Sequence, residues 1–129
     1  MDVVKTLFGI VVTLAIGDVT WLSLRNEYHT KLIESIQKTK LEVRWIPAIA
    51  VYGIIVVALY LGAVQDAKSL TDAILRGSIV GLLLYAFYDL TNYATLVNYT
   101  LEMTVIDITW GTLLCAAAAT AGFYFKATK

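Results

Sequence analysis

The chain has 129 residues, of which 59% are hydrophobic, and its mean hydropathy is +0.73. This composition excludes a water-soluble globular domain and indicates a multi-pass integral membrane protein with one domain, residues 1–129. Charged residues make up only 16% of the chain and the formal net charge is zero, which argues against nucleic acid as a partner. The expected partners are the lipid bilayer, protons, small cations and other membrane helices.

Four apolar stretches are long enough to cross a hydrocarbon layer about 30 Å thick, which takes about 20 helical residues. They cover residues 3–24, 45–64, 73–93 and 103–125. The expected fold is therefore all-α, an antiparallel up-down-up-down four-helix bundle in the membrane. Both termini would lie on one side together with the connection 65–72, and the two other connections would lie on the opposite side.

The first apolar run, residues 7–16, has the length of a signal-peptide core. However, no small-x-small cleavage site follows it, and apolar residues resume after Asp18. We therefore expect a retained membrane helix.

The connection from residue 25 to residue 43 has a helical pattern. Tyr28, Leu32 and Ile36 recur every four residues, and Glu27 precedes Lys31 by four, a spacing that places each set on one helical face. We expect a short amphipathic helix that lies at the membrane interface. The alternative is a simple helical extension of the first span.

The third and fourth spans are rich in small residues. Gly77 and Gly81 are spaced as in a GxxxG motif, and Ser69 or Thr71 is expected to cap the start of the third span. Small side chains let helix backbones approach closely, so we expect these faces to pack on a neighbouring helix or a second subunit, and we expect a homo-oligomer. In the fourth span the small residues are Gly111, Cys115, Ala116, Ala117, Ala118, Ala119, Ala121 and Gly122.

Basic residues do not decide the orientation of the chain in the membrane, because equal numbers fall on the two sides. One side has Arg25, Lys31, Lys38, Lys40 and Arg44. The other side has Lys5, Lys68, Arg76, Lys126 and Lys129.

Three aspartates interrupt the apolar spans: Asp18, Asp89 and Asp107. At 1.5 Å per helical residue they lie about 9, 6 and 6 Å inside the ends of their spans, all on the same side. A charged side chain in hydrocarbon costs roughly 2.5 to 3.5 kcal/mol. Three carboxylates at one level cannot all ionise cheaply, so we expect at least one of them to hold a proton or a cation.

Two of these aspartates begin the same short motif, Asp-x-Thr-Trp, at Asp18–Trp21 and Asp107–Trp110. If the first and fourth helices pack antiparallel, a pseudo-two-fold axis in the membrane plane relates the motifs, and the two Trp rings bracket the carboxylates. The alternatives are a chance repeat and a purely structural polar network that fixes helix register.

The expected site extends beyond the aspartates. Asp89 shares a helical face with Tyr85 and Asn92, and Arg25 and Arg44 are the candidate counter-ions because a guanidinium stays charged. No catalytic residue is assigned, the sequence requires no cofactor, and a divalent cation is one possible ligand. The residues assigned to ligand or ion binding are Asp18, Trp21, Tyr85, Asp89, Thr91, Asn92, Asp107 and Trp110.

Three segments resemble a family of small predicted membrane proteins, the domain-of-unknown-function 2177 family. They are Tyr88-Asp89-Leu90-Thr91-Asn92, Asp107-x-x-Trp110-Gly111-Thr112 and Asp18-x-x-Trp21-Leu22. The resemblance covers nearly the whole chain. It implies four transmembrane helices and singles out Asp18, Trp21, Asp89, Thr91, Asn92, Asp107 and Trp110, but it implies no activity.

The favoured function is a small membrane channel or carrier in which the aspartates bind a proton or cation. One alternative is a lipid-binding or lipid-modifying membrane enzyme with a divalent cation, and another is an accessory subunit of a membrane complex. A non-enzyme is favoured, since the only histidine, His29, is in a connection, Cys115 lies in an apolar helix and no GxSxG motif is present.

Overall fold

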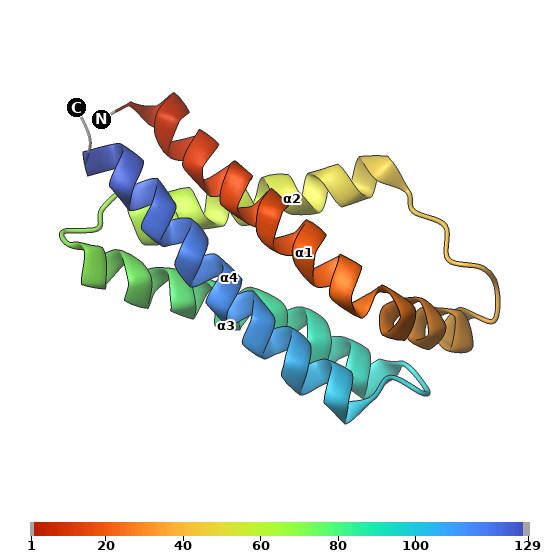
Figure 1. Ribbon diagram of the computed structural model, residues 1–129. Helices are drawn as coiled ribbons and strands as arrows, with labels where there is room; N and C mark the ends of the chain where they lie inside the picture. Colours follow the sequence, from red (N-terminus) through yellow and green to blue (C-terminus); the bar gives the residue numbers. More distant parts are fainter. Residues whose placement is uncertain (1, 128–129) are drawn as a thin grey trace.

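The computed structural model describes residues 2–127 as four antiparallel helices joined by short connections (Figure 1). Lys129, which entered the comparison of basic residues, lies outside that range. The elements are α1 (Val3–Gln37), α2 (Trp45–Leu59) with its π-helical continuation η1 (Tyr60–Val64), α3 (Leu70–Thr95) and α4 (Leu101–Ala127).

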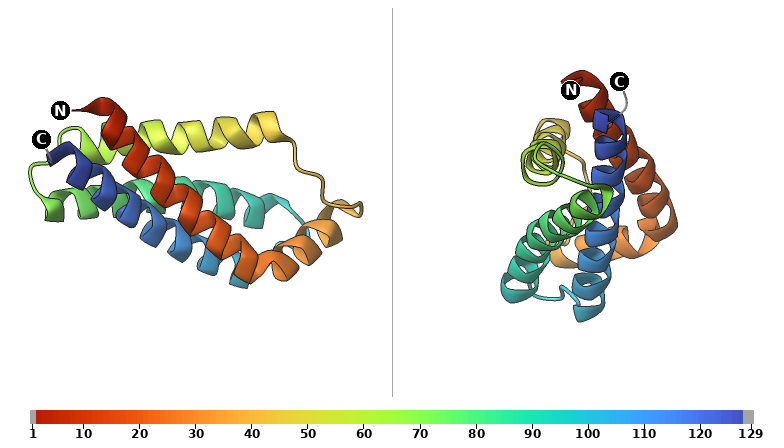
Figure 2. Two further views of the ribbon diagram at one scale, coloured as in Figure 1. Left: turned by 45° about the horizontal axis from the view of Figure 1, so that its top comes forward. Right: turned by 90° about the vertical axis from the view of Figure 1, so that its left-hand side faces the viewer.

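All four predicted spans are confirmed as helices, and within residues 2–127 each is long and apolar enough to cross a membrane, α2 being counted together with η1. The start of α1 and the end of α4 lie side by side, next to the connection between η1 and α3 (Figures 1 and 2). The connections after α1 and α3 lie at the opposite end. This arrangement confirms the up-down-up-down order of the bundle.

The expected separate interfacial helix is wrong, because residues 25–37 continue α1 without a break. No glycine or proline lies between Asp18 and Lys38 to end the helix. The later part of α1 turns away from the axis of the first part (Figure 2). Thr20 and Ser23 donate hydrogen bonds to the carbonyls of the residues four before them, a contact that often bends helices.

The end of α1 covers the connection between α3 and α4. Leu32 packs against Tyr99 and Met103 in a small buried cluster. The Tyr28 hydroxyl forms a 2.6 Å hydrogen bond with Thr100 Oγ1. This end of α1 therefore closes the polar end of the bundle.

Helices α3 and α4 meet at glycine, which confirms that their small residues mediate a close helix contact. A Cβ atom at Gly81 would lie 2.5 Å from the Gly111 carbonyl oxygen, and one at Gly77 would lie 2.5 Å from the Ala119 Cβ. No larger residue fits at this spacing. Because the small faces are occupied inside the chain, self-association stays a prediction.

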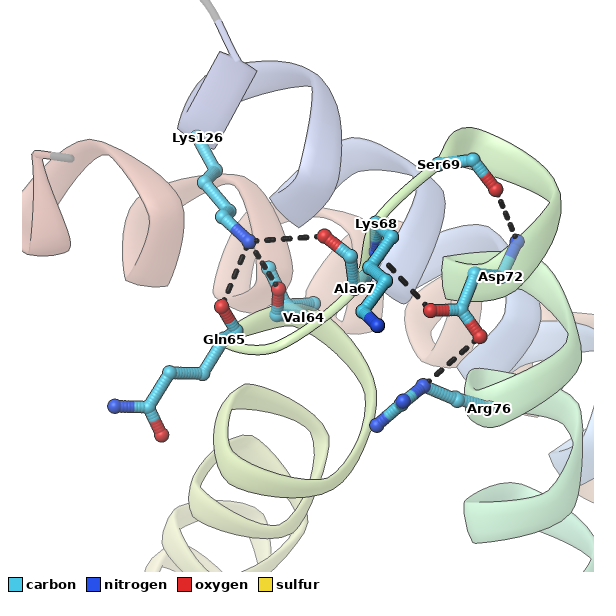
Figure 3. Close-up of polar contacts among 8 residues, drawn as sticks. All are labelled: Val64, Gln65, Ala67, Lys68, Ser69, Asp72, Arg76 and Lys126. Atoms are coloured by element: carbon cyan, nitrogen blue, oxygen red, sulfur yellow. Dashed lines mark hydrogen bonds and ion pairs between the residues drawn. The ribbon is translucent and has the colours of Figure 1, made fainter.

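Lys126 holds the terminal end of the bundle together (Figure 3). Its Nζ donates hydrogen bonds to three carbonyl oxygens near the end of η1, those of Val64, Gln65 and Ala67, at 3.0, 2.7 and 3.2 Å. These carbonyls would otherwise lack partners at a helix end. The last turn of α4 is thereby fixed to the connection that precedes α3.

The start of α3 is capped as the sequence predicts. Ser69 Oγ accepts a 3.0 Å hydrogen bond from the Asp72 backbone N–H, the usual N-cap geometry. The Asp72 carboxylate in turn accepts from the Lys68 backbone N–H and pairs with Arg76 at 2.9 Å (Figure 3).

Helix α2 stands apart from the other three helices (Figure 2). Its C-terminal end and η1 are anchored in the main core, where Leu59, Ala63 and Val64 are buried against α1 and α4. By contrast, Ile46 and Ile49 near its start are exposed. Grooves consequently lie on both sides of α2, and three of the candidate site residues, Asp18, Tyr85 and Asp107, line them.

Candidate functional site

The three aspartates of the spans come from three helices and lie near one another. Asp89 on α3 is fully buried and Asp107 on α4 is 8% exposed, while Asp18 on α1 is half-buried. Asp89 lies six residues before the end of α3 and Asp107 six residues after the start of α4, so each is about 9 Å from its helix end.

Asp89 and Asp107 form a carboxyl pair, since their side chains lie within hydrogen-bonding reach of each other. Asp89 Oδ1 accepts a 2.5 Å hydrogen bond from the Tyr99 hydroxyl. Asp89 Oδ2 is buried and has no donor among the described residues. A proton carried by either carboxyl would satisfy this oxygen.

Tyr99, in the connection after α3, is suited to be a permanent donor to this pair. Burial raises the pKa of the Tyr99 hydroxyl, and the hydrogen bond to Asp89 raises that pKa further. The hydroxyl therefore keeps its proton at neutral pH. Asn92 also lies against the hydroxyls of Tyr88 and Tyr99, which places it beside the carboxyl pair.

Asp18 has its own donors. Its two carboxylate oxygens accept hydrogen bonds from the Tyr52 hydroxyl on α2 and from Trp110 Nε1 on α4, the latter at 3.2 Å. Asp18 also interacts electrostatically with Asp107. The cluster thus consists of the carboxyl pair and one neighbouring, separately satisfied carboxylate.

The two motif tryptophans stack on each other, so the expectation that they bracket the carboxylates is wrong. Their ring centroids are 4.7 Å apart and their planes differ by 4°. Gly17 lies against the Trp110 ring, and this close approach of α1 and α4 leaves both rings in one stack. Trp110 Nε1 donates to Asp18, but Trp21 Nε1 is buried without a hydrogen-bond partner in the described part of the chain.

Of the two counter-ion candidates, Arg25 alone lies near the cluster. Its guanidinium carbon is 4.4 Å from the Tyr28 ring centroid and 5.7 Å from that of Trp21, and its charge acts on Asp107. Within residues 2–127 it forms no ion pair, and its buried Nε and Nη2 lack hydrogen-bond partners. Arg44 is exposed at the start of α2.

Two cavities flank Tyr52. The α2–α3 cavity has a volume of about 360 Å³ and is lined by Asp18, Tyr52, Tyr85, Tyr88, Asp107 and aliphatic side chains. The α1–α2 groove has a volume of about 610 Å³ and reaches Asp18 and Tyr52 between apolar side chains of both helices. Both volumes are in the range of small-molecule sites.

The remaining predicted site residues, Tyr85 and Thr91, differ in whether they line a cavity. Tyr85 lies over Gly111 and lines the α2–α3 cavity, whereas Thr91 is exposed and lines neither cavity. Sequence reasoning missed Tyr52, Tyr88 and Tyr99. Tyr52 is one of two hydroxyl-bearing residues, with Tyr60, in the apolar span 45–64, which is the signal that could have found it.

The donor set does not favour a metal ion. Among the described residues, no three His, Cys, Asp or Glu side chains are arranged to share one. Hard divalent cations take six or more oxygen ligands, or keep several waters. The carboxyl pair instead suits a proton.

The family model described as "Predicted membrane protein (DUF2177)" matches residues 3–124. The chain belongs to this family. No curated protein and no solved structure shows significant similarity to the chain. Together with the four apolar helices, family membership establishes a multi-pass integral membrane protein.

Proposed function

We propose that this protein is a small membrane carrier that binds an exchangeable proton on the carboxyl pair, Asp89 and Asp107. The observation that supports this most directly is the buried, unpartnered Oδ2 of Asp89 beside the carboxyl group of Asp107. Two adjacent carboxyl groups in a low-dielectric interior resist double ionisation. A single proton held between them satisfies the free oxygen and belongs to the pair.

The surroundings of the pair support a site that gains and loses this proton. Arg25 acts on Asp107 from the α1 side, and its unpartnered N–H groups stabilise the pair when the proton leaves. Tyr99 donates to Asp89 in both states. Intramembrane acidic groups with such partners are typical of proton relays and coupled carriers.

A carrier is favoured over a continuous channel, because the polar cluster lies near one end of the bundle. Toward the termini the interior is filled by apolar side chains that are fully or almost fully buried, among them Ile10, Leu14, Leu59, Cys115 and Ala118. Such close-packed interiors leave no path for water or ions. Exchange with the terminal side therefore needs a conformational change.

Proton flux into proteoliposomes, measured with a trapped pH-sensitive dye under an imposed membrane potential, tests this proposal. We expect the purified parental protein to carry protons and the Asp89→Asn and Asp107→Asn variants to lose the flux. Asp66→Asn is the matched control, because Asp66 is exposed in the connection before α3 and the same charge is removed away from the pair.

Each variant must keep its helical circular dichroism and its elution volume in detergent. Flux at the parental rate in a triple variant with Asn at positions 18, 89 and 107 contradicts the proposal. The absence of proton flux from the parental protein contradicts it as well.

A further inference from the structure

The α2–α3 cavity combines acidic and aromatic side chains in an unusual way. Asp18 and Asp107 line it together with three tyrosines, Tyr52, Tyr85 and Tyr88, and no basic side chain of residues 2–127 lines it. This chemistry repels anions. An aromatic ring attracts a cation over its face, and several rings around one site are typical of ammonium recognition.

The charge of the cluster leaves room for one cation. Among the described residues, the one guanidinium that opposes the charge of Asp18, Asp89 and Asp107 is that of Arg25, and the proposed function adds one proton on the carboxyl pair. One negative charge is then left over on this cluster, two of whose carboxyl groups line the cavity. Asp107 is more than nine-tenths buried and lines the cavity, and among the described residues no hydroxyl, amide or guanidinium group donates a hydrogen bond to it.

The walls of the cavity are apolar. Val51, Ile54 and Ile55 of α2 face Leu84 of α3 across it. A small hydrated ion such as Na⁺ gains nothing from these aliphatic walls, whereas a cation with alkyl or aryl substituents buries apolar surface on them. The cavity volume of about 360 Å³ is in the range of sites that bind small organic molecules of this kind.

We propose that the α2–α3 cavity binds a hydrophobic organic monocation, with its charged centre among Asp107, Asp18 and the three tyrosine rings. This inference rests on the proposed function, because it names the substrate class of the same carrier. The cation would take the negative charge that remains beside the protonated pair, and its positive charge would lower the proton affinity of that adjacent pair. Loading the cation then favours release of the proton.

This coupling between cation and proton depends on every group that acts on the pair. Arg25, Asp18 and the half-buried His29 act on the pair from α1. Tyr85 and Tyr88 of α3 and Tyr99 of the following connection act on it as well. Tyr52 of α2 donates to Asp18, and Cys115 of α4 acts on Tyr85. Of these, only His29 has an ordinary titration range near neutral pH, so His29→Gln belongs in every pH series.

Equilibrium dialysis of the purified protein in detergent tests the site, with tetraphenylphosphonium as the probe and tetraphenylborate as its anion of matched shape. We expect the cation to bind and the anion not to bind above the level of empty micelles. Asp107→Asn should weaken binding at least tenfold, because it removes the unpaired charge. Lowering the pH should weaken binding by up to about tenfold per pH unit, as the coupling between cation and proton requires.

Tyr88→Leu keeps the assay informative where Asp107→Asn is unstable. Loss of one ring should weaken cation binding by about threefold to tenfold. Tyr93→Leu, which changes an exposed ring outside the cavity, should leave binding unchanged. Equal binding of both probes overturns the inference, because an apolar groove that takes any lipid chain would give the same result. Unchanged cation binding in Asp107→Asn and Tyr88→Leu overturns it as well.

The dialysis result and the flux result are independent. Cation binding without proton flux supports the site but contradicts the carrier. Proton flux without cation binding supports the carrier but overturns the substrate class.

Discussion

Trp110 of α4 stacks flat on Trp21 of α1, but only one of the two indole N–H groups is used. Trp110 Nε1 donates to Asp18 at 3.2 Å, and Trp21 Nε1 is buried with no hydrogen-bond acceptor among residues 2–127. The two halves of the repeated motif are therefore chemically unequal. This asymmetry gives a matched pair of substitutions.

Trp110→Phe should destabilise the folded protein more than Trp21→Phe. Both substitutions keep an aromatic ring in the stack, but only Trp110→Phe removes a hydrogen bond to a carboxylate, worth about 1 to 3 kcal/mol. Unfolding in mixed micelles of increasing denaturing detergent measures the difference. Equal destabilisation of the two variants would show that the bond to Asp18 contributes nothing.

Tyr99→Phe should make the free energy of unfolding less dependent on pH in the alkaline range. The pKa of Tyr99 is raised in the folded state by burial and by Asp89, so its contribution is fully present below the unfolded-state value of about 10. It is lost as the pH rises above that value. The parental protein should therefore lose stability more steeply than Tyr99→Phe between about pH 9 and pH 11, as followed by detergent unfolding; parallel curves would contradict this.

Gly111→Ala should destabilise the bundle and move Tyr85 out of the α2–α3 cavity. A Cβ at Gly111 would lie 2.0 Å from Tyr85 Cγ, and overpacking of this kind costs about 1 to 3 kcal/mol. Gly53→Ala is the control, because a Cβ there meets nothing within 4 Å and alanine favours a helix by about 1 kcal/mol. If Gly111→Ala is as stable as the parent, the contact between Tyr85 and α4 is not tight.

Tyr52→Phe should loosen the first half of α2. The Tyr52 hydroxyl bonds to Asp18 in a helix half that is otherwise flanked by two open grooves. Its loss should speed amide hydrogen exchange across residues 45–55 by about fivefold to tenfold, measured by mass spectrometry in detergent. Tyr60→Phe, at the start of η1, should leave these rates unchanged.

The spans and their order could be predicted from the sequence, because the length of an apolar stretch decides whether a helix crosses the membrane. The common level of Asp18, Asp89 and Asp107 could also be predicted, since the rise per residue fixes depth along each helix. Neither argument fixes the rotation of a helix about its own axis. For that reason the pairing of Asp89 with Asp107, and of Asp18 with Tyr52, was not foreseen.

Other features depend on contacts between segments far apart in the chain. The helical pattern after Arg25 allowed either a separate helix or an extension of the first span, and the extension is stabilised by a contact that no local pattern indicates, the packing of Leu32 on Tyr99. The donation from Tyr99 to Asp89 requires the conformation of the short connection that includes Asn98, whose φ is +73°. Sequence periodicity carries no information about such connections.

The π-helical turn η1 determines which side of α2 faces the other helices, because it sets the rotation of α2 about its own axis. Its turn is widened by one residue and is closed by the hydrogen bond from Gln65 N–H to the Tyr60 carbonyl. This extra residue follows α2 directly in the chain. Removing one residue from η1 would rotate α2 by about 100° about its own axis relative to the core. Tyr52 would then face lipid instead of Asp18, so one peptide unit far from the carboxylates determines whether α2 closes over them.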